Sequence, residues 1–70
     1  MTAYLSRKWL TEIRKQNKLS QEEMAGKIGI SQTYYGQIEI GTKGKPLNVN
    51  VAKKIAEVLG FEWTKFYEEN

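Results

Sequence analysis

The side chains that could carry acid–base or metal chemistry in this chain are few in kind. Its 70 residues include no His and no Cys, so imidazole bases, thiolate nucleophiles, disulfides and the usual zinc ligands are all missing. The remaining candidates for catalysis are carboxylates, lysines and tyrosines, and no acid and base have a spacing that indicates a catalytic pair. We therefore expect no enzyme activity, no metal site and no cofactor.

The distribution of charge is the second chemical feature. The formal net charge is +3, and the excess of Lys and Arg precedes an acidic end that contains Glu62, Glu68 and Glu69. An uneven basic charge is compatible with a polyanionic partner such as nucleic acid. The alternative is that the lysines only solvate the surface, because slightly basic small domains are common.

Apolar residues recur at three- and four-residue spacing along most of the chain, which predicts amphipathic helices. Ser20 and Glu23 make a capping box, and Ser31 is a second N-cap candidate. Gly29 and Gly60 lie where the apolar pattern stops, as expected just past a helix end. The predicted helices span residues 6–17, 21–28, 32–39 or 32–40, a segment from Asn48 or Asn50 to Leu59, and a short aromatic helix or turn over 61–67.

These elements predict the fold class, which is an all-α, compact bundle of five short helices. A chain of this length holds one domain, residues 1–70, with room for a single core, and 40% of its residues are hydrophobic. No apolar run is long enough to span a bilayer, and residues 1–10 lack the apolar segment of a signal peptide. We therefore expect a cytoplasmic protein without a membrane partner.

Residues 19–41, LSQEEMAGKIGISQTYYGQIEIG, closely resemble the helix-turn-helix of the XRE family, which includes the lambdoid phage repressors and Cro proteins. The resemblance rests on the Leu-Ser-Gln-Glu-Glu opening, Ala25, the turn over 29–31 and the Ile38-Glu39-x-Gly41 ending. It extends upstream to Leu10 and downstream to Trp63, so it covers nearly the whole chain. It implies a lambda repressor-like domain whose recognition helix, residues 32–39, enters the major groove of DNA.

The resemblance implies that one face of the recognition helix reads DNA bases. Gln32, Thr33, Gly36 and Gln37 match positions that face base edges in the phage proteins. A Gln amide complements adenine N6 and N7, and a Thr methyl can contact a thymine methyl. The alternative is a solvated helix face. Gly36 departs from the pattern, because it leaves the middle of the helix without a side chain, at a cost of about 1 kcal/mol in helix propensity relative to Ala.

Phosphate contacts are expected on either side of this helix. Gln21 matches a glutamine that binds backbone phosphate at the start of the preceding helix, where the helix terminus is partly positive, and Ser20 lies beside it. Tyr34, Lys43 and Lys45 are further candidates, although a charged loop is often only solvated. The loop after the recognition helix is less basic than in the most basic phage relatives. We therefore expect no minor-groove arginine contact and a larger contribution from dimerisation.

Two further positions have structural roles by the same resemblance. Arg14 and Glu39 match residues that form an internal ion pair in several phage repressors, joining the first helix to the end of the recognition helix. Tyr35 matches a position that is apolar and points inward. We expect these three residues to stabilise the fold.

Together these expectations describe a transcriptional regulator that binds double-stranded DNA sequence-specifically, of the phage or prophage repressor type. It would act as a homodimer on a pseudo-palindromic operator and need no small-molecule ligand. The alternative is a protein-interaction module of the same fold, such as an antitoxin or adaptor, because fold alone does not determine function.

Overall fold

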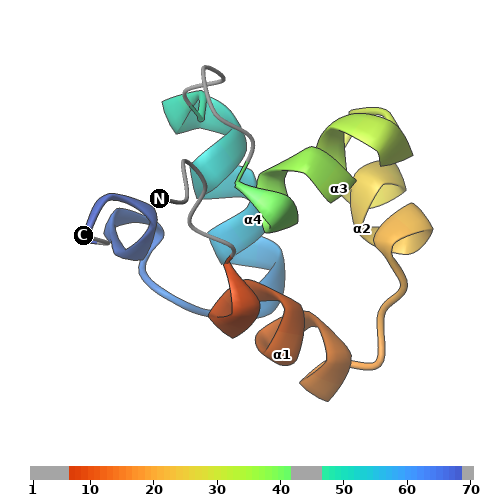
Figure 1. Cartoon of the computed structure of the whole chain (residues 1–70), viewed down its shortest axis with the longest axis horizontal. Helices are drawn as coiled ribbons and strands as arrows, with labels where there is room; N and C mark the ends of the chain where they lie inside the picture. The colour runs from red at the N-terminus through yellow and green to blue at the C-terminus, as the bar shows by residue number, and fades with distance from the viewer. Residues whose placement is uncertain (1–6, 42–46, 69–70) are drawn as a thin grey trace, which may run out of the picture.

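Five short helices surround one apolar interior in the computed structural model, which describes residues 7–41 and 47–68 (Figure 1). No strand occurs within those two segments. The expected all-α class is confirmed, and the fifth helix is a 3-10 helix. None of the helices in the described segments is long and apolar enough to cross a membrane. The elements are α1 (Lys8–Gln16), α2 (Gln21–Ile28), α3 (Gln32–Ile40), α4 (Val49–Leu59) and η1 (Trp63–Tyr67).

Local hydrogen bonds determine where α2 and α3 begin. Ser20 Oγ accepts a hydrogen bond from the Glu23 N–H at 3.0 Å, and Glu23 Oε1 accepts one from the Ser20 N–H at 2.8 Å, which is the expected capping box. Ser31 Oγ accepts from the Tyr34 N–H at 3.0 Å in the same way. Between the two helices, Gly29 has a φ of +77°, a conformation that costs glycine little. These caps limit the α2–α3 connection to a tight turn.

The structure defines the ends of α1 and α4 more closely than the sequence could. α1 is shorter than the predicted 6–17 helix, because the Arg7 backbone (φ −91°, ψ 68°) is not helical and Asn17 is the C-cap; Ser6 lies outside the described residues. α4 begins after Asn48, whose Oδ1 accepts hydrogen bonds from the Asn50 N–H at 2.7 Å and the Val51 N–H at 3.4 Å. The helix start is therefore capped by Asn48, and Asn50 lies inside the first turn.

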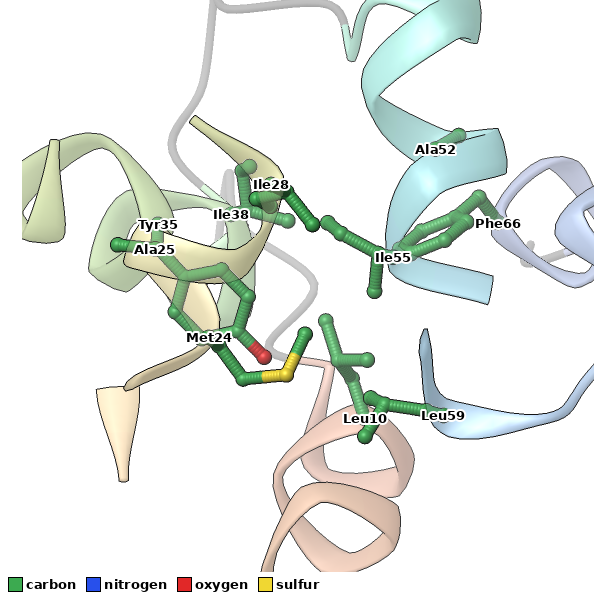
Figure 2. Close-up of a cluster of buried hydrophobic side chains, with 10 residues drawn as sticks. All are labelled: Leu10, Met24, Ala25, Ile28, Tyr35, Ile38, Ala52, Ile55, Leu59 and Phe66. Carbon is green, nitrogen blue, oxygen red and sulfur yellow. The ribbon is translucent and has the colours of Figure 1, made fainter. Parts of the chain in front are cut away.

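The core is formed by side chains from all five helices. Figure 2 shows them pointing toward one another, with Ile55 of α4 and Leu10 of α1 near the centre. α4 runs through the middle of the molecule, with α2 and α3 on one side and η1 on the other (Figure 1). The buried cluster consists of Leu10, Met24, Ala25, Ile28, Tyr35, Ile38, Ala52, Ile55, Leu59 and Phe66.

The aromatic residues near the C-terminus divide into two groups. Phe61 and Phe66 pack against Trp9 of α1, with ring centroids 5.3 and 5.2 Å from the Trp9 ring, and so extend the core. Trp63 and Tyr67 instead pack on each other at 5.9 Å, and the Tyr67 side chain is exposed. The C-terminal aromatic segment therefore adds Phe61 and Phe66 to the core, while Trp63 is half-buried and Tyr67 is exposed.

Candidate nucleic-acid interface

α3 has one face in the core and one face in solvent. Tyr35, Ile38 and Glu39 are buried. Because successive residues of an α-helix are rotated by about 100°, residues 33, 36 and 37 point away from these three, and Gln32 lies at the edge of that side in the first turn. Gln32 and Thr33 are exposed there, while Gly36 and Gln37 are half-buried. The structure thus brings the four residues expected to face DNA bases onto one surface of α3.

The start of α2 lies beside α3 and carries two residues expected to bind phosphate. Ser20 is exposed, and its Oγ accepts the capping hydrogen bond from Glu23, which leaves the hydroxyl hydrogen to donate elsewhere. Tyr34, the third expected phosphate ligand of this region, is half-buried and packs against the core cluster. Lys43 and Lys45 lie outside the described residues.

Gln21 is engaged inside the protein in a way that the sequence did not indicate. Its Nε2 donates a hydrogen bond to Glu39 Oε1 at 3.0 Å. Its Oε1 lies 3.5 Å from the position that a Cβ on Gly36 would occupy, so the amide extends across the middle of α3. An added Cβ would make only ordinary van der Waals contact there, so the space at Gly36 is not sterically required. The Gln21 side chain ties the start of α2 to α3 and keeps one N–H and its backbone amide for other partners.

Glu39 is the centre of a buried hydrogen-bond network. Arg14 Nε donates to Glu39 Oε2 at 2.6 Å, and Arg14 Nη2 donates to Glu39 Oε1 at 3.3 Å. Thr11 Oγ1 donates to Oε1 at 2.9 Å, and Arg14 Nη1 reaches the Leu19 carbonyl at 2.8 Å. Arg14 and Glu39 are 8% and 5% exposed. The pair therefore joins α1, the α1–α2 connection and the C-terminal half of α3.

The network also shifts the pKa values of its two charged members. Burial alone would raise the pKa of Glu39, but the hydrogen bonds from Arg14, then Gln21, outweigh it and leave that pKa below its usual value. The hydrogen bond to Glu39 raises the pKa of Arg14. Both groups are charged near neutral pH, as an ion pair requires.

Arg7 is a second contact that sequence reasoning missed. Its backbone N–H donates to the Glu39 carbonyl at 2.8 Å, and its Nη1 donates to the Ile38 carbonyl at 2.6 Å. Carbonyls in the last turn of a helix have no partner within the helix, and a cation there also interacts favourably with the helix dipole. The sequence showed Arg7 only as one basic residue among several. Arg7 therefore provides hydrogen-bond donors to two carbonyls in the last turn of α3.

The chain is similar to known proteins over nearly all of its length. A family model described as helix-turn-helix matches residues 10–66, which include the Arg14–Glu39 pair, the capped helices α2, α3 and α4, and the Gln21 contact. The chain is also 48% identical over 65 residues to a protein of Bacillus subtilis (strain 168) called an uncharacterized HTH-type transcriptional regulator, YqaF. That match covers 93% of this chain and 83% of the Bacillus protein. The chain belongs to the XRE-type helix-turn-helix family.

Proposed function

We propose that this protein regulates transcription by binding double-stranded DNA sequence-specifically, as a repressor of the phage or prophage type. The observation that supports this most is the outer face of α3, where Gln32, Thr33 and Gln37 lie together beside the capped start of α2. The glutamine amides can form paired hydrogen bonds with adenine N6 and N7 in the major groove, and the N–H groups at the start of α2 can bind a phosphate. The name of the Bacillus relative agrees with a role in transcription.

Two copies are expected to act together on one operator. A single short helix contacts few bases, and dimers of this fold class place two recognition helices about 34 Å apart on successive major grooves. The operator should therefore have approximate two-fold symmetry. Selection of bound sequences from a random double-stranded DNA pool tests the proposal directly. Enrichment of a two-fold-symmetric site is expected, and no enrichment would favour the adaptor alternative, in which the same surface binds a protein.

A matched pair of glutamine variants tests whether α3 reads bases. Gln37→Ala should cost about 1 to 3 kcal/mol on the selected site and little on unrelated DNA, so its specificity ratio should fall. Gln16→Ala, an exposed glutamine at the end of α1, should change neither affinity. Thermal melts must first show that both variants fold like the parent. Equal losses on both DNAs, or no loss, for Gln37→Ala would contradict base reading by α3.

Salt dependence tests the phosphate contacts separately. Binding should weaken steeply as salt rises, because each phosphate contact releases condensed counterions. Lys43→Ala should weaken binding to every sequence alike and lower the salt slope by about one unit, since a phosphate carries no sequence information. Affinity that stays constant between low and physiological salt would contradict the proposed binding mode.

A further inference from the structure

Ile40 is an apolar residue that the protein leaves in solvent at the end of α3. Its side chain is 59% exposed, more than the other exposed large hydrophobics, Tyr67 at 49% and Val49 at 43%, in the described segments. A single exposed apolar residue is ordinary on protein surfaces and needs no function. Its position relative to the other exposed residues of α3 is the informative feature.

Ile40 lies on the same side of α3 as the expected base-reading residues, at the C-terminal end of the helix. It follows Gln37 by three positions, Gly36 by four and Thr33 by seven, and residues at these spacings share one side of a helix. The buried residues of α3 occupy the opposite side. One turn earlier, Gly36 has no side chain, and only Gln21 Oε1 borders the space that a Cβ would fill. Because residue 36 has no side chain, it does not hold DNA away from this part of α3.

The apolar side chain of Ile40 suits only one kind of group in the major groove of DNA. An isoleucine side chain has no hydrogen-bonding atom, so it cannot distinguish the donors and acceptors of the base edges. The major groove offers one apolar group, the C5-methyl of thymine, and an apolar side chain can contact it. We propose that Ile40 contacts a thymine C5-methyl in each half-site and so contributes to sequence preference; this rests on the proposed function.

Uracil substitution in the DNA isolates this contact, because deoxyuridine lacks only the methyl group of thymidine. In the site selected from the random pool, each thymidine is replaced in turn and affinity is measured for the parent protein and Ile40→Ala. For the parent, at least one thymidine in each half-site should lose about three- to fourfold affinity, the worth of burying one methyl-sized group. For Ile40→Ala the loss at that position should disappear, while the effects at other thymidines persist.

Two control variants make the result specific. Val49→Ala removes another exposed apolar side chain, on α4, and should keep the parent pattern at every thymidine. Thr33→Ala removes a methyl elsewhere on the α3 face and should leave the loss at the Ile40-dependent thymidine unchanged. Thermal melts of all three variants should match the parent, since the residues are exposed.

The outcomes separate this proposal from the function on which it rests. If the parent enriches a site but Ile40→Ala has the same thymidine-to-deoxyuridine ratios at every position, the methyl contact is overturned while DNA reading stands. Weaker self-association of Ile40→Ala without DNA, with unchanged ratios, also overturns it and assigns Ile40 to a contact between copies. If the parent enriches no site, the proposed function itself fails, and the methyl contact fails with it.

Discussion

Removing one partner of the Arg14–Glu39 ion pair should cost this protein much of its folding free energy. The two side chains are 9% and 5% exposed, and their closest nitrogen and oxygen atoms are 2.6 Å apart. Truncating either one leaves the other charge buried without its counter-ion, which costs about 3 to 5 kcal/mol. A 70-residue chain is expected to have only about 4 to 10 kcal/mol in total. Arg14→Ala and Glu39→Ala should therefore lose at least about a third of this free energy, and they should unfold at physiological temperature if the parent lies at the low end of the range.

Conservative and double variants separate the charge from the packing. Glu39→Gln keeps one oxygen for Arg14 but removes its counter-ion and turns an amide N–H toward other donors. We therefore expect a loss between the usual worth of a hydrogen bond to a charged group, about 1.5 to 3 kcal/mol, and the loss of the alanine variants. Arg14→Met combined with Glu39→Leu should recover most of the stability lost in either alanine variant. Apolar residues of similar volume avoid the desolvation cost that a buried ion pair must offset.

Urea unfolding followed by circular dichroism measures these differences, with linear extrapolation to water. Lys15→Ala is the matched control, because Lys15 is the exposed neighbour of Arg14 on α1, and it should change stability by no more than about 0.5 kcal/mol. Alanine variants of Arg14 and Glu39 within about 1 kcal/mol of the parent would refute the reasoning, since an uncompensated buried charge costs more. A double variant no more stable than either single one would contradict the desolvation account.

Three further predictions concern stability. The pKa of Glu39 is lowered from 4.5 in the folded protein. The ionised carboxylate therefore stabilises the fold fully above pH 4.5, and this stabilisation is lost as the pH falls toward the folded-state pKa. Acid should lower the melting temperature more for the parent than for Glu39→Gln. Parallel pH profiles would contradict this. Among the described residues the buried Tyr35 hydroxyl makes no hydrogen bond of ordinary geometry, although it lies close enough to Glu39 and Arg14 to interact with both charges. Tyr35→Phe should therefore change the free energy of unfolding by less than about 1 kcal/mol, and a larger loss would show that the hydroxyl is a working member of the Arg14–Glu39 network. Lys18 has a φ of +60°, so Lys18→Gly should stabilise the fold by about 0.5 to 1 kcal/mol in urea titrations, and a loss would show that its side chain contributes more than the backbone strain costs.

The elements of the fold could be predicted where interactions within one turn decide them. Ser20 and Glu23 satisfy each other's backbone donors across three residues, and Gly29 and Gly60 adopt positive φ just past their helices. Such contacts depend on sequence distance alone, so residue types are sufficient to locate them. The choice between Asn48 and Asn50 could not be made in this way, because either side chain can cap a helix from its own position.

The candidate site was only partly predictable because its supporting contacts join distant parts of the chain. Arg7 reaches a carbonyl 31 residues away, and Gln21 reaches a carboxylate 18 residues away. Neither spacing has a sequence signal, since both depend on how α1 and α2 pack against α3. The family resemblance assigned Gln21 to phosphate from its position alone. The structure adds a hydrogen bond from Gln21 to Glu39, which uses one of the two side-chain amide hydrogens of Gln21.

The contact between Gln21 and Glu39 connects the interior to the proposed DNA-binding surface. Glu39 Oε2 is held by Arg14, while Oε1 accepts from Gln21 at the start of α2 and from Thr11 of α1. One carboxylate therefore positions α2 relative to α3, and these helices carry the proposed phosphate and base contacts respectively. A phosphate contact and a base contact can form together only if the distance between them matches the DNA. The ion pair therefore has a consequence beyond stability, because it helps to set the spacing between the two sets of contacts.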